Sequence, residues 1–78
     1  IMEENMKLVA GFETTSEALL MENFCKNKNI KGDMIPVPEE FGAGCGLAFR
    51  FQSENFEKIK KILDEENISY KVLKVLDI

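Results

Sequence analysis

The sequence predicts an α+β fold in which two helices pack on one face of a four-stranded antiparallel sheet. Short segments with alternating apolar residues, typical of half-buried strands, are interspersed with two segments whose apolar residues recur at helical spacing. The resulting order is β-α-β-β-α-β. The two halves also echo each other, because Asn29-Ile30 precedes Met34-Ile35 with the same spacing as Asn67-Ile68 precedes Val72-Leu73.

This repeat indicates two split βαβ units related by a pseudo-twofold axis. With right-handed crossovers, such units pack as a ferredoxin-like sandwich with strand order 4-1-3-2 and both helices on one face of the sheet. The 78 residues suffice for one hydrophobic core, so we expect a single domain over residues 1–78.

The first half begins with a strand predicted over residues 6–12, followed by a helix. Thr14 is a suitable N-cap for that helix, and Glu17 three residues later completes a capping box. The basic and amide residues at 26–29 are expected to end it, since cations are favoured at a helix C-terminus.

A second strand is predicted over residues 34–37, after a turn at Gly32-Asp33. Pro36 and Pro38 place this strand at an edge of the sheet, because proline cannot donate a hydrogen bond to a neighbouring strand.

The second half repeats the pattern. Residues 47–51 alternate between large apolar side chains and Ala or Arg, as in a half-buried strand. Ser53 is expected to cap the second helix and Asn67 to end it, before a last strand over residues 70–76. The buried stripe of this helix is expected to consist of Phe56, Ile59, Ile62 and Leu63.

Composition restricts the classes of partner. The net charge of −4 argues against nucleic acid, and no apolar run is long enough for a membrane span. Two cysteines without a framework spacing fit a reducing cytoplasm. A domain this small is marginally stable alone, and burial in a homodimer is one way to add apolar contact.

The strongest candidate site is the loop Gly42-Ala43-Gly44-Cys45-Gly46, which follows Pro38. Its glycines leave the thiol accessible and permit positive φ, and the proline stiffens the approach. Successive backbone N–H groups of such a turn can form an anion nest that favours a thiolate. A tight turn with an incidental cysteine is the alternative interpretation.

Other chemistries find less support in the residues. The chain has no histidine, and two cysteines are too few for a structural zinc site, so we expect neither a bound metal nor Cys–His hydrolysis. No Gly-Lys-Ser/Thr follows the glycines, which excludes a P-loop. An RNA-recognition motif on the third strand would need aromatic residues where Cys45, Leu47 and Arg50 stand.

Two further residues have alternative roles. Cys25 lies on the apolar stripe of the first helix and is expected to be a buried structural residue. Arg50 is either a solvated strand residue or a positive group that helps the loop to bind an anion.

The block Ile35-Pro36-Val37-Pro38, a short loop, and then Cys45 to Phe51 resembles the selenium/sulfur carrier protein-like family of small bacterial proteins. The resemblance extends over nearly the whole chain, and its more specific part is Pro-x-Pro followed by Cys-Gly-x-Ala. Members often carry a basic residue after the second proline and a serine in the loop, where this chain has Glu39 and Gly42.

The resemblance implies a carrier in which Cys45 holds sulfur or selenium as a persulfide or selenopersulfide. Gly44 and Gly46 would give access and N–H groups, and Pro36 and Pro38 would fix the loop. Gly42, Pro38 and Arg50 would also belong to the binding residues. The carried atom would be bound covalently without a cofactor, and the partners would be a donor and an acceptor protein. The alternatives are a small ligand-binding or regulatory module, and a protein–protein adaptor without cysteine chemistry.

Overall fold

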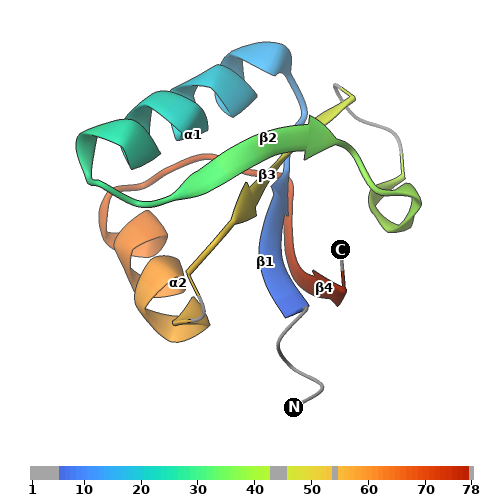
Figure 1. Cartoon of the computed structure of the whole chain (residues 1–78). Helices are drawn as coiled ribbons and strands as arrows, with labels where there is room; N and C mark the ends of the chain where they lie inside the picture. The colour runs from blue at the N-terminus through green and yellow to red at the C-terminus, as the bar shows by residue number, and fades with distance from the viewer. Residues whose placement is uncertain (1–5, 43–45, 54, 78) are drawn as a thin grey trace.

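A computed structural model describes residues 6–42, 46–53 and 55–77 of the chain. The four strands form one antiparallel sheet in the order β2-β3-β1-β4, which is the predicted order read from its other edge. Figure 1 shows both helices on the same side of this sheet, as predicted for the α+β fold. The elements are β1 (Met6–Gly11), α1 (Thr15–Asn27), β2 (Gly32–Pro36), the 3₁₀-helix η2 (Glu39–Phe41), β3 (Leu47–Phe51), α2 (Phe56–Glu65) and β4 (Val72–Asp77).

The main core fills the layer between the helices and the sheet. Alternate residues of β1 and β3 point into it, as the period-two pattern predicted, and the rings of Phe49 and Phe51 meet edge to face with centroids 5.0 Å apart. The buried residues of this core are Leu8, Ala10, Phe12, Ala18, Met21, Cys25, Phe49, Phe51, Ile59 and Leu63.

A second, smaller apolar cluster lies on the opposite face of the sheet. It consists of Val9 from β1, Ala48 from β3 and Phe41 from η2, all buried. The chain segment between β2 and β3 therefore does not merely connect two strands, because one of its side chains covers part of the face that the helices leave open.

The predicted turn at Gly32-Asp33 is wrong, because both residues belong to β2. The Phe49 ring lies against Gly32, where a side chain would collide with it, and Asp33 faces Arg50 across the β2–β3 ladder. Glycine is needed here for close packing of an aromatic ring against the strand. The predicted edge position of this strand is confirmed.

The cap of the second helix was also misassigned. Asn55, and not Ser53, is the N-cap of α2, and its Oδ1 accepts a hydrogen bond of 3.2 Å from the Lys58 N–H. Ser53 instead accepts a bond of 3.1 Å from the Asn55 N–H. Both residue types suit a cap, and only the path of the chain decides which of them satisfies the first turn.

At the first helix, the predicted N-cap Thr14 is confirmed. Its Oγ1 accepts a hydrogen bond of 3.2 Å from the Glu17 N–H. The Glu17 carboxylate, however, accepts from the Glu13 N–H at 3.0 Å, one residue before the position that a capping box requires. Of the helices in the described ranges, none is long and apolar enough to cross a membrane.

Candidate functional site

The segment that joins β2 to β3 is held at both of its ends. The Val37 N–H donates a hydrogen bond of 3.1 Å to the Gly46 carbonyl, which extends the β2–β3 ladder by one pair. Within the segment between Val37 and Gly46, the Phe41 N–H donates a hydrogen bond to the Pro38 carbonyl and the Gly42 N–H donates one to the Glu39 carbonyl, each at 3.0 Å. Figure 1 shows this segment beyond the end of β2. Pro38 thus starts η2 as its N-cap, with a φ of −66° that suits proline.

Phe41 fixes η2 to the sheet. Its side chain is 8% exposed and packs beside Val9 and Ala48. The ring lies directly over Gly11 of β1, where an added Cβ would stand 2.5 Å from Phe41 Cδ2. Sequence reasoning assigned Phe41 no role, although an aromatic residue in a glycine-rich segment, opposite a glycine in a strand, is a signal that could have found it.

Two of the predicted site glycines adopt the conformations expected of them. Gly42 has a φ of 71° and Gly46 a φ of 88°, and a Cβ at either position would meet nothing within 4 Å. Glycine is therefore favoured there by backbone conformation and not by lack of space. Gly44 and Cys45 lie outside the described residues, so their roles stay predictions.

Cys25 has the buried position that its place on the helix predicted. It is 1% exposed in the main core, and burial raises the pKa of its thiol to about 11. At neutral pH this thiol is protonated and shielded, which makes it a poor nucleophile.

Arg50 forms an ion pair on the face of the sheet that the helices leave open. Its Nη2 lies 2.7 Å from Asp33 Oδ2 and its Nε 3.2 Å from Oδ1, and Gln52 Nε2 donates to the same carboxylate at 3.0 Å. The hydrogen bond from Arg50 holds the pKa of Asp33 below its usual range. Arg50 is the fourth residue of β3, so it lies about 10 Å along the strand from Leu47. Its role as an anion ligand stays a prediction.

The charges that adjoin the loop are negative. Glu39 and Glu40 are exposed in η2, at and next to the position where the related family often has a basic residue. Within the described ranges, no group of three or more His, Cys, Asp or Glu residues could hold a metal ion.

The comparisons with known proteins gave one match. A family model described as "Putative Se/S carrier protein-like" matches residues 7–73, which include all elements except the first residue of β1 and the last four residues of β4. No curated protein and no solved structure matched the chain.

Proposed function

Because the chain belongs to the Se/S carrier protein-like family, we propose that Cys45 carries a sulfur or selenium atom as a persulfide or selenopersulfide. The observation that carries this proposal is the burial of the other cysteine. Cys25 is enclosed in the core and its thiol pKa is raised to about 11, so it is unsuited to exchange with a partner protein. A carrier that works through a cysteine would then have to use Cys45.

The proposed loading step is an exchange without net oxidation. The Cys45 thiolate attacks the outer sulfur of a donor persulfide, R–S–SH, and the S–S bond of the donor breaks. The product is Cys45–S–SH, and the donor leaves as a thiolate that takes up the proton lost by Cys45. With selenium the attacked atom is the selenium of R–S–SeH. Transfer to an acceptor repeats the step in the other direction.

The anchored ends of the loop support this assignment. Phe41 and the Val37–Gly46 hydrogen bond hold the chain on both sides of Cys45. We propose that the N–H groups of Gly44 and Gly46 favour the thiolate, with the open conformation of Gly42 and the rigid Pro38 at the entry to the loop. Arg50, which pairs with Asp33, would add positive potential from β3. A free thiol of this kind needs a reducing compartment, so we propose a cytoplasmic protein.

The pH dependence of alkylation tests the proposal. In a Cys25→Ala variant, Cys45 should react with iodoacetamide in the folded protein, with a pKa below the ordinary ~8.5 of a free cysteine. A Cys45→Ala variant, which retains only Cys25, is the matched control and should react only on unfolding. Slow labelling of Cys45 that requires denaturant would refute the carrier.

Loading itself can be measured with a cysteine desulfurase and cysteine as the sulfur source. Intact-mass analysis should show the gain of one sulfur atom on the Cys25→Ala variant and none on a Cys45→Ser variant. Persulfidation of the Cys45→Ser variant would contradict the assignment. Sedimentation of the same samples distinguishes the monomer from the homodimer, on which the carrier proposal does not depend.

A further inference from the structure

The two halves of the chain repeat one structural unit, which allows each surface feature to be compared with its counterpart. Each helix is followed by an asparagine in the left-handed region, Asn29 with a φ of 60° and Asn67 with a φ of 56°. After each, an isoleucine N–H bonds back to the helix, from Ile30 to the Cys25 carbonyl at 2.8 Å and from Ile68 to the Leu63 carbonyl at 3.0 Å. Equivalent residues are thus 38 apart, since 67 − 29 = 38 and 68 − 30 = 38.

Each of these turns faces the helix of the other half across a cavity that is open to solvent. The turn after α1 faces α2 across a cavity of about 380 Å³ that also borders Gln52 and Ser53. The turn after α2 faces α1 across a cavity of about 400 Å³. We call the first the lysine cavity and the second the counterpart cavity. Both cavities follow from the repeated fold, so their presence alone does not indicate a ligand. Only the charge and polarity of their lining residues can indicate which of them binds one.

The charge of the two cavities differs sharply. Lys28, Lys31 and Lys58 line the lysine cavity, and no acidic residue is among its described lining residues. Adding or subtracting 38 gives their equivalents as Glu66, Ser69 and Leu20. Among the described residues that line the counterpart cavity, none is cationic and one, Glu17, carries a carboxylate. A chain with a net charge of −4 therefore places three lysines around one of two similar hollows.

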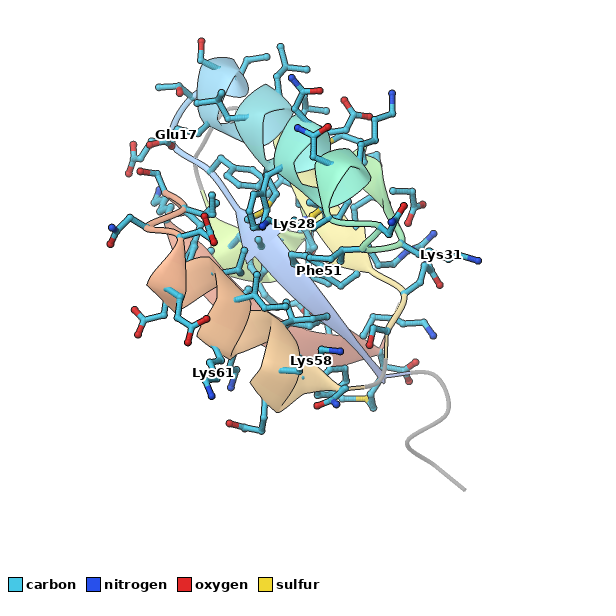
Figure 2. All side chains as sticks on the ribbon, turned by 90° about the vertical axis from the view of Figure 1, so that its left-hand side faces the viewer. Glu17, Lys28, Lys31, Phe51, Lys58 and Lys61 are labelled. Atoms are coloured by element: carbon cyan, nitrogen blue, oxygen red, sulfur yellow. The ribbon has the colours of Figure 1, made fainter. Side chains whose placement is uncertain are left out.

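The lysines of the lysine cavity are only weakly neutralised by the rest of the described protein. Lys28 Nζ lies 3.9 Å from Glu66 Oε2, and both side chains are about half exposed, so water screens this pair strongly. Among the described residues, no carboxylate lies within ion-pair distance of Lys31 or Lys58. Figure 2 shows the three lysines on the same side of the molecule.

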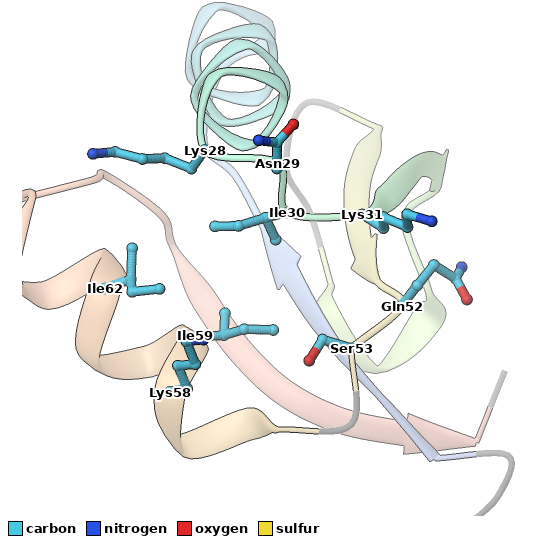
Figure 3. Close-up of a pocket in the computed structure, with 9 residues that line it drawn as sticks. All are labelled: Lys28, Asn29, Ile30, Lys31, Gln52, Ser53, Lys58, Ile59 and Ile62. Carbon is cyan, nitrogen blue, oxygen red and sulfur yellow. The ribbon is translucent and has the colours of Figure 1, made fainter.

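The floor of the lysine cavity is apolar. Ile30 and Ile62 are half-buried and Ile59 is 3% exposed, and Figure 3 shows the three isoleucines together, with Ser53 at the side. The ammonium groups stand on flexible four-carbon stems that can swing toward a bound anion. A cavity of this size is within the range of small-molecule sites, which are mostly apolar with a few polar groups.

We infer that the lysine cavity binds a small anion with a short apolar part, such as an alkyl phosphate or an alkyl carboxylate. The apolar part would lie on Ile30, Ile59 and Ile62, and the anionic group would be held by Lys28, Lys31 and Lys58. The site does not depend on the proposed carrier chemistry. Lys31 precedes β2 and Gln52 follows β3, whereas the loop that contains Cys45 joins the opposite ends of these five-residue strands, about 17 Å away.

The test is a titration of ¹⁵N-labelled protein with hexyl phosphate, followed by amide chemical shifts. The expected result is saturable shifts at residues 28–31, 52–53 and 58–62, with none at 67–69 and 20–24 of the counterpart cavity. Inorganic phosphate and 1-hexanol, each of which lacks one half of the probe, should bind more weakly. Equal shifts at both cavities would show that apolar hollows alone attract the probe and would overturn the inference.

Variants separate the site from general charge attraction. Lys28→Gln, Lys31→Gln and Lys58→Gln together should weaken hexyl phosphate binding by about tenfold, because the charge-assisted contacts are lost. The control variant Lys60→Gln, Lys61→Gln and Lys74→Gln removes the same charge elsewhere on the exposed surface and should bind nearly as the parent does. Equal weakening in both triple variants would reject the site. Cys45→Ala should leave this binding unchanged, so the two proposals fail independently.

Discussion

Replacing Gly11 by alanine should destabilise the protein, although the same change in an ordinary strand would stabilise it. Glycine in a strand is unfavourable relative to alanine by about 0.5–1 kcal/mol, because it loses more backbone freedom on folding. At Gly11, however, the new Cβ would stand 2.5 Å from Phe41 Cδ2 and 2.8 Å from Val72 Cγ1. Real Cβ atoms do not approach other atoms so closely, and the Phe41 ring has to move.

The magnitude follows from the burial of that ring. Phe41 is 8% exposed, and burying a phenylalanine side chain stabilises a fold by about 1.5–3 kcal/mol. If the ring is displaced, this contribution is lost, and the backbone gain of about 0.5–1 kcal/mol is subtracted from the loss. The expected net cost of Gly11→Ala is then about 0.5–2.5 kcal/mol in the free energy of unfolding.

A double-mutant cycle with Phe41→Ala, measured by urea denaturation, isolates the cause. Once the ring is absent, only the close contact with Val72 Cγ1 opposes the backbone gain, so Gly11→Ala should be close to neutral. The coupling energy then equals the net cost in the parent protein, about 0.5–2.5 kcal/mol. Gly46→Ala is the matched control. Its cost comes from the φ of 88°, with nothing within 4 Å of the added methyl group, and should be the same with or without Phe41. A stabilising Gly11→Ala, or a cost that persists unchanged in the Phe41→Ala background, would refute the reasoning.

Two further predictions concern the helices and their ends. Burial raises the pKa of the Cys25 thiol to about 11, above the ~8.5 of an unfolded cysteine. The protonated thiol therefore contributes its full stabilisation to the free energy of unfolding below pH ~8.5, and this stabilisation is lost as the pH rises toward 11. Unfolding experiments should show a loss of up to about 3 kcal/mol over this range that is missing in Cys25→Ala, and parallel curves for the two proteins would contradict it. Asn29→Ala and Asn67→Ala should each destabilise the protein by about 1 kcal/mol, because both positions have a positive φ that alanine adopts only with strain. The corresponding glycine variants should be nearly neutral. Alanine variants as stable as the parent in thermal unfolding would argue against backbone strain at these positions.

The sequence predicted the architecture well because its strongest signals are local. The alternation around Phe49 and Phe51 placed the central strand, and the paired Asn-Ile turns revealed the repeat. The predictions were wrong where a contact with another element determines the role of a residue. Gly32 has the composition of a turn residue, but it lies in β2 because the Phe49 ring packs against it. For α2, the path of the chain determines which of two suitable residues is the N-cap.

The same division applies to the candidate site. The burial of Cys25 follows from its place on an apolar helix stripe and was predicted. The ion pair of Arg50 with Asp33 was not, because it requires the register of β2 against β3. An aromatic residue in a glycine-rich segment is a local signal for Phe41, but its contact with Gly11 is set by the fold, and the residue was missed.

Because η2 is attached to the sheet through one buried aromatic ring, the burial of that ring also determines how often η2 detaches from the sheet. Phe41 is the one buried side chain of η2, so detaching the segment costs about the value of burying that ring, 1.5–3 kcal/mol. Such a gap corresponds to an open population of roughly 1–10% at equilibrium. Amide exchange in residues 39–42 would therefore proceed by sub-global opening, while the central strands exchange only when the whole domain unfolds. The segment that leads into the Cys45 loop can therefore rearrange without loss of the sheet beneath it.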